Sequence, residues 1–135
     1  MSEEKFGHRA EEMVQEALRR QGDRVKPASH FEDHVLKLDF WVWHARRQQW
    51  LPIQFTVNLG RAVTDKGADA LGRGVIISWL PAEKLDAWAE THSLDLQNWL
   101  VTKFWTQVEA VLQAKGPELE RLWNRPSWIR LLPKG

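Results

Sequence analysis

Two segments in which apolar and polar residues alternate constrain the fold of this chain more than any other feature. The first covers residues 36–43, the second covers residues 51–57, and the polar connection 46–49 lies between them. Alternation with a period of two is typical of strands that bury one face. A short polar connection between two such strands indicates a hairpin. The sequence therefore predicts a sheet that contains this hairpin.

Polar side chains on the hairpin form a first candidate site. Asp39 in the first strand, and Gln54 and Thr56 in the second, fall on the face opposite to the apolar residues. Polar groups on adjacent antiparallel strands come within about 5 Å of each other. Two oxygen atoms at this spacing can share one divalent cation. The hairpin therefore predicts a candidate metal site.

The segments on either side of the hairpin predict the rest of the core. Residues 6–18 place apolar side chains on one helical stripe, with Glu11 at its edge and Gly22 as a stop. A helical stretch at about 62–71 precedes the unbroken apolar run 74–80, which is typical of a strand buried on both faces. Their lengths indicate a right-handed crossover between parallel strands. The predicted order is a helix, a strand or two, the hairpin, a helix and a central strand.

Beyond residue 80 the sequence predicts helices. Residues 81–89 form a helix with proline in its first turn. A longer helix covers about 95–114, Gly116 and Pro117 end it, and a short helix follows at about 118–123. We expect a single α/β domain over residues 1–135, with a core at about 5–80 and a C-terminal helical extension at about 81–135.

The order of these segments and several short motifs resemble the PD-(D/E)XK nuclease superfamily. The residues that carry the resemblance are Gly7, Ala10 and Glu11, the acidic stretch 29–33, Asp39, and Gln54-Phe55-Thr56. The resemblance implies a restriction-endonuclease-like mixed sheet with an α-β-β-β-α-β core, similar to archaeal Holliday junction resolvases. It also implies a metal-dependent endonuclease that hydrolyses the phosphodiester bonds of nucleic acid.

The same resemblance implies a ligand set for the metal. Asp39 is expected to bridge Mg²⁺ or Mn²⁺, and Gln54 and the backbone carbonyl of Phe55 are expected to complete the set. Glu11 would assist through water. The bound cation would polarise the phosphodiester and lower the pKa of a bound water.

The chain departs from the family pattern at residues 54–56, where the family usually has Glu or Asp, any residue, and Lys. Gln54 contributes no charge, so the affinity for a cation should be lower. Thr56 cannot supply the positive charge that stabilises a developing anion. Lys66 or Arg61 is expected to take over that role, and Lys66 is preferred. The alternative is that Lys66 is an ordinary solvated helix lysine.

Local basic clusters, rather than overall charge, predict the contacts with nucleic acid. The net charge is +1, unlike that of a protein that coats nucleic acid non-specifically. Arg46 and Arg47 at the hairpin tip are candidates for phosphate contacts, as is Arg61. Trp43 shares a strand face with Asp39 and is a candidate for base stacking. A solvated turn is the alternative for the two hairpin arginines, and DNA is favoured over RNA.

The C-terminal helices are a second candidate interaction surface. The chain contains nine tryptophans, most of which the spacing predicts to be core anchors. Trp123 and Trp128 are candidates for a homodimer or partner-protein contact. Basic residues at positions 121, 125, 130 and 134 either help to bind nucleic acid or keep this segment soluble.

Several other chemistries are excluded. The chain has no cysteine, so it forms no disulfide, thiolate metal site or cysteine nucleophile. Its five histidines show no zinc-binding spacing, and neither a Gly-rich phosphate loop nor a GxSxG motif occurs. The charged start and the lack of an 18-residue apolar run predict neither a signal peptide nor a membrane span. We therefore expect a cytoplasmic protein.

Two interpretations of function remain. The first is a nuclease-like protein that requires Mg²⁺ or Mn²⁺ and uses Asp39, Gln54, Glu11 and Lys66. The second is a protein of the same fold that has lost catalysis and binds nucleic acid or another protein. Thr56 favours the second interpretation, whereas the retention of two acidic residues favours the first.

Overall fold

The computed structural model describes residues 3–60 and 65–133, except for the side chains of residues 3–8, 34–35 and 65–66. Its N-terminal half contains α1 (Glu3–Arg20), β1 (Val25–Pro27), the π-helical turn η1 (Glu32–Leu36), β2 (Phe40–His44) and β3 (Gln49–Thr56). Its C-terminal half contains α3 (Asp65–Gly72), β4 (Ile76–Trp79), α4 (Ala82–Thr91), α5 (Leu94–Trp123) and α6 (Pro126–Ile129). None of the helices within these ranges combines the length and the apolar character that a membrane crossing requires.

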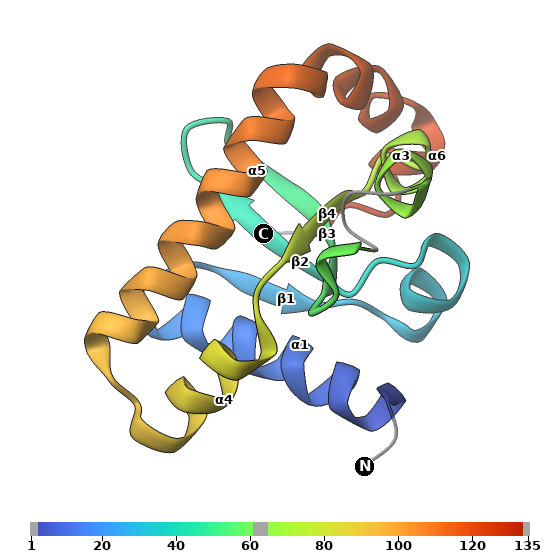
Figure 1. Cartoon of the computed structure of the whole chain (residues 1–135). Helices are drawn as coiled ribbons and strands as arrows, with labels where there is room; N and C mark the ends of the chain where they lie inside the picture. The colour runs from blue at the N-terminus through green and yellow to red at the C-terminus, as the bar shows by residue number, and fades with distance from the viewer. Residues whose placement is uncertain (1–2, 61–64, 134–135) are drawn as a thin grey trace.

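The four strands form one mixed sheet in the order β1-β2-β3-β4 (Figure 1). β1 and β3 are both antiparallel to β2, and β4 is parallel to β3. The predicted hairpin is confirmed, with Phe40 opposite Ile53 and His44 opposite Gln49. The predicted α/β class and the parallel pairing after the crossover are confirmed as well.

Helices cover both faces of the sheet. One face carries buried residues of all three long strands, among them Phe40, Ile53 and Ile76. Phe40 stacks on Phe104 of α5, with ring centroids 6.1 Å apart. Figure 1 shows α5 crossing this region from α4 to α6. The opposite face includes Trp41, whose ring packs edge-on against Trp128 of α6 at 6.2 Å.

The first hairpin strand is shorter than predicted, because the segment before it forms the π-helical turn η1. The Ser29 N–H donates to Oε1 of Glu32 at 2.7 Å, and the Glu32 N–H donates to Oγ of Ser29 at 3.2 Å. This reciprocal pair is a capping box, which nucleates a helical turn. Lys37 then adopts a left-handed conformation, with φ of 54°. The predicted strand was therefore wrong over residues 36–39, although the Asp39 N–H still donates to the Ile53 carbonyl.

α5 is one helix of 30 residues, so the prediction that Gly116 and Pro117 end it was wrong. Leu112 and Leu119 are buried on either side of the proline. Their packing overrides the loss of one backbone hydrogen bond at Pro117. Figure 1 shows α5 bending towards its C-terminal end, as expected for a helix that contains proline.

β4 is an edge strand rather than the predicted central strand. Its outer edge is covered by the Gln107 side chain of α5. The Trp79 N–H donates to Oε1 of Gln107 at 2.8 Å, and Nε2 of Gln107 donates to the Trp79 carbonyl at 2.7 Å. At Trp79 a side-chain amide, instead of another strand, therefore satisfies both backbone groups.

Candidate carboxylate site

Asp39 lies immediately before β2 and continues the register of the hairpin. Its N–H donates to the Ile53 carbonyl at 2.7 Å. Its Oδ2 accepts a hydrogen bond from the Phe55 N–H at 2.6 Å. Both contacts join Asp39 to β3, so the hairpin fixes the carboxylate beside the position of Gln54, as the sequence predicted.

Glu11 of α1 reaches the same carboxylate. It is partly buried, and its carboxyl group hydrogen-bonds to Asp39. Desolvation by burial, followed by the negative charge of Asp39 and the hydrogen bond to Asp39, raises the pKa of Glu11 from 4.5 to about 8. Glu11 therefore stays protonated at neutral pH and donates a hydrogen bond to Asp39. The helix and the hairpin, 28 positions apart in the sequence, form an acid pair.

The acid pair fits a cation that needs few protein ligands. Two carboxyl groups that share a proton can bind a divalent cation instead, because the cation neutralises both charges. Mg²⁺ usually retains several waters and takes only one or two carboxylates from a protein. Within the described part of the chain, no group of three or more His, Asp or Glu residues could hold a metal ion. Among the described acidic and histidine side chains, a cation bound here would therefore have Glu11 and Asp39 as its ligands and no third such group.

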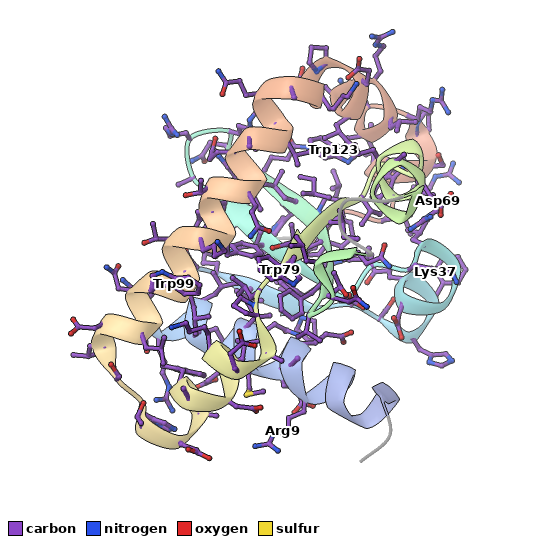
Figure 2. All side chains as sticks on the ribbon, viewed as in Figure 1. Arg9, Lys37, Asp69, Trp79, Trp99 and Trp123 are labelled. Atoms are coloured by element: carbon purple, nitrogen blue, oxygen red, sulfur yellow. The ribbon has the colours of Figure 1, made fainter. Side chains whose placement is uncertain are left out.

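Arg73, at the end of α3, occupies the position next to Gln54. Its Nη2 donates to Oε1 of Gln54 at 3.1 Å, and its Nε donates to the Leu36 carbonyl at 3.1 Å. Its Nη1 pairs with Asp69. Figure 2 shows Asp69 and Lys37 on the same side of the molecule. The Arg73 guanidinium joins Asp69 of α3 to Leu36 of η1. The amide oxygen of Gln54, predicted as a metal ligand, therefore faces a cationic side chain.

The other two residues of the degenerate motif have structural contacts. Phe55 has a buried side chain and donates its N–H to Asp39. The Thr56 hydroxyl accepts from the Asn58 N–H at 3.1 Å, which stabilises the turn at the end of β3. Thr56 thus contributes to the local backbone, and Arg73 is a described cationic side chain that contacts the motif.

The two residues predicted to replace the lysine of the family motif fall largely outside the described residues. Arg61 is not described. Lys66 lies in the first turn of α3, one turn before Asp69, but its side chain is outside the described part. Arg73 was missed because it lies between the helical stretch predicted at about 62–71 and the apolar run 74–80, where no pattern marks a functional residue. Gly74, which follows it, has a φ of 86°.

The hairpin arginines lie at the far end of β2 from the acid pair. Arg47 Nη1 pairs with Glu120 of α5 at 2.8 Å, and Arg46 Nη2 lies 3.8 Å from Glu109. The five residues of β2 separate this turn from Asp39, which is about 17 Å along a strand. Direct contact with a phosphate at the acid pair is therefore excluded for both arginines, although a bound duplex could span the distance.

Trp43 belongs to a basic and aromatic cluster on the sheet. Its ring packs edge-on against Trp50 at 5.5 Å. The Arg24 guanidinium lies 5.2 Å from the Trp43 ring and 5.1 Å from the Trp50 ring, and the Lys26 ammonium lies 5.1 Å from Trp50. The Trp43 ring, predicted to stack a base, is thus already in contact with a cation.

The two C-terminal tryptophans are core residues. Trp123 is 2% exposed and Trp128 is 6% exposed. Trp123 Nε1 donates to the Gly74 carbonyl at 2.7 Å, and Figure 2 shows Trp123 where α5 approaches α3. The expectation that these two side chains contact a partner was therefore wrong, because their packing inside the molecule leaves almost no accessible surface.

Comparison with known proteins does not assign the chain to a family. No protein-family model, no curated protein and no solved structure matches the chain.

Proposed function

We propose that this protein is a nuclease-like phosphodiesterase that binds Mg²⁺ or Mn²⁺ at the paired carboxyl groups of Glu11 and Asp39. The observation that carries the proposal is the direct hydrogen bond between these two acids, which come from α1 and from the start of β2. The chain order of the described core, α1-β1-β2-β3-α3-β4 with η1 between β1 and β2, supports the resemblance to the PD-(D/E)XK superfamily.

The side chains of the site have distinct tasks under this proposal. Asp39 is held by the Phe55 N–H, so one of its carboxylate oxygens is fixed. Glu11 gives up its proton when a cation binds. The bound cation supplies Lewis-acid polarisation of the phosphodiester and a more acidic water. Under this proposal, both carboxyl groups therefore balance the charge of the cation at a partly buried site.

Arg73 supplies the positive charge that the motif lacks at Thr56. Its guanidinium lies beside the strand that carries the motif and contacts Gln54. Its charge is permanent, and a phosphate would replace Asp69 or Gln54 as the partner of its donors. We therefore prefer Arg73 to Lys66 as the residue that stabilises a developing negative charge.

The deciding experiment measures cleavage of single-stranded, duplex and branched DNA and of RNA with Mg²⁺ or Mn²⁺. Asp39→Asn keeps an oxygen that can accept from the Phe55 N–H but removes the charge, so cleavage should fall to background while the fold persists. Glu16→Gln on the same helix as Glu11 changes an acid that pairs with Arg20 and should leave cleavage unchanged.

Two further variants identify the basic residue. Arg73→Ala should reduce kcat by about 10²–10³, the cost of losing one donor to a developing anion. Lys66→Ala should have no comparable effect. The reverse result would restore Lys66 to the site. A folded protein that cleaves none of these substrates with either metal would refute the nuclease proposal.

A second candidate function is a nucleic-acid or protein-binding module without catalysis. It is favoured by the engagement of two motif residues in structural contacts, Gln54 with Arg73 and Thr56 with Asn58. This alternative predicts that the wild-type protein binds its ligand equally well in EDTA and in Mg²⁺. Cleavage that disappears in Asp39→Asn would exclude it.

A further inference from the structure

A groove of about 460 Å³ lies between α3 and the C-terminal part of α5. Leu71, Leu119 and Leu122 contribute apolar side chains to its lining. Figure 1 shows that α3 and α6 lie beside this end of α5. The groove is separate from the acid pair, yet one of its walls is α3, the helix that ends immediately before Arg73.

Three basic residues form the rim of this groove: Lys115, Arg121 and Arg125. All three are exposed, and Glu118 is the only acid among the described residues that line the groove. Other arginines are paired with carboxylates, for example Arg47 with Glu120. Among the residues that the structure describes, none of the three rim cations forms such a pair. With three cations and one acid among the described lining residues, the rim therefore offers a net positive charge to a ligand.

Helix stabilisation does not account for these charges. Arg121 lies in the last turn of α5, where a cation interacts favourably with the helix dipole. Lys115 lies about 9 Å earlier along the axis, because each residue rises about 1.5 Å. Arg125 lies beyond the end of α5 and caps α6. Two of the three charges are thus outside the turn in which the dipole has its effect.

The position of α3 indicates that the ligand of this groove is an extended polyanion. Gly72 lines the groove, and the next residue, Arg73, reaches Gln54 beside the acid pair. A ligand with charges spaced along its length could contact the rim and pass over this end of α3 to Asp39. None of the described residues that line the groove is aromatic, so they provide no stacking platform of the kind that single-stranded bases prefer. Regularly spaced phosphates of a duplex fit these features best.

We propose that Lys115, Arg121 and Arg125 bind the phosphate backbone of a nucleic-acid duplex, next to the segment that lies at Glu11 and Asp39. This inference rests on the proposed function for its second part, the location of the acid pair along the same duplex. The rim supplies sequence-independent affinity and sets the direction in which the duplex leaves the site.

The test is the binding of a fluorescein-labelled 20-base-pair DNA duplex, followed by anisotropy in EDTA so that no cleavage occurs. Replacing all three rim residues by alanine should weaken binding at least tenfold at 100 mM salt. The slope of log K against log salt should become shallower by about 0.9 for each phosphate that the variant no longer neutralises. Lys84→Ala removes an exposed lysine from α4 and should change neither quantity. Thermal unfolding of the triple variant checks its fold.

The outcomes separate this inference from the proposed function. An unchanged salt slope, or an equal loss of affinity in Lys84→Ala, would overturn the inference even if the protein cleaves DNA. Competition by polyglutamate as strong as that by unlabelled duplex would also overturn it and indicate an acidic protein partner. If the protein binds the duplex through the rim residues but cleaves no substrate, the result would support the inference about the rim and refute the nuclease proposal.

Discussion

Replacing Glu11 by glutamine should change how the stability of the cation-free protein depends on pH. The pKa of Glu11 is raised to about 8 in the folded protein. At pH values below 4.5 it is protonated in both the folded and unfolded states and imposes no penalty. Between 4.5 and 8 the unfolded chain loses this proton while the folded protein keeps it, so rising pH favours unfolding. Above pH 8 the penalty is complete and constant.

The size of the effect follows from the same pKa. The change from 4.5 to about 8 corresponds to an upper bound of about 5 kcal/mol. Glu11 is partly open to water, and solvent screening reduces the effect to about 2 kcal/mol. A glutamine at this position can still donate a hydrogen bond to Asp39 and carries no charge at any pH. The variant should therefore be about 2 kcal/mol more stable than wild type at pH 9 and nearly equal to it at pH 4.

Urea denaturation in EDTA at pH values from 4 to 9 measures this difference. Glu16→Gln is the matched control, because Glu16 lies on the same helix in an exposed pair with Arg20, and its pH profile should follow that of wild type. Parallel profiles for wild type and Glu11→Gln would refute the acid pair. Such a result would show that Glu11 ionises normally and does not face Asp39.

Three further predictions concern the cation and the packing around β4. Mn²⁺ should raise Tm more at pH 8 than at pH 6, because Glu11 must release its proton for the cation to bind; a scan of Asp39→Asn should show no such increase. Gly74→Ala should destabilise the protein by about 1–3 kcal/mol in urea denaturation, because φ is 86° and the added Cβ would lie 2.9 Å from Trp128. Trp123→Phe should cost about 1–3 kcal/mol in the same assay, because the Gly74 carbonyl loses its 2.7 Å hydrogen bond; an unchanged midpoint would contradict this.

The hairpin was predictable because local patterns determine it. Alternation with a period of two specifies which face of each strand is buried, and a slip of one residue would expose the apolar set. The observed pairing of Phe40 with Ile53 places Asp39 next to Gln54, as the alternation predicted. The acidic position on the first helix was predictable from the edge of its apolar stripe. The family resemblance itself remains a prediction.

The features that the sequence did not reveal depend on competition between local patterns or on contacts between residues that are far apart in the sequence. The capping box of Ser29 and Glu32 competes with the strand pattern and forms η1 instead. Packing on both sides of Pro117 carries α5 through a proline that the local pattern would treat as a stop. The contact of Arg73 with Gln54 joins two elements 19 positions apart. No periodicity in either segment indicates that contact.

The amide of Gln107 bears on how the protein behaves at high concentration. An open edge strand is a template on which another chain can add a strand, and such addition leads to fibrils. The carboxamide of Gln107 has the same donor and acceptor as a peptide bond, and it occupies both backbone groups of Trp79. The opposite edge is the three-residue strand β1, which ends in Pro27. Each border of the sheet thus carries a feature that opposes intermolecular strand addition, the Gln107 amide at Trp79 and the short, proline-ended strand β1.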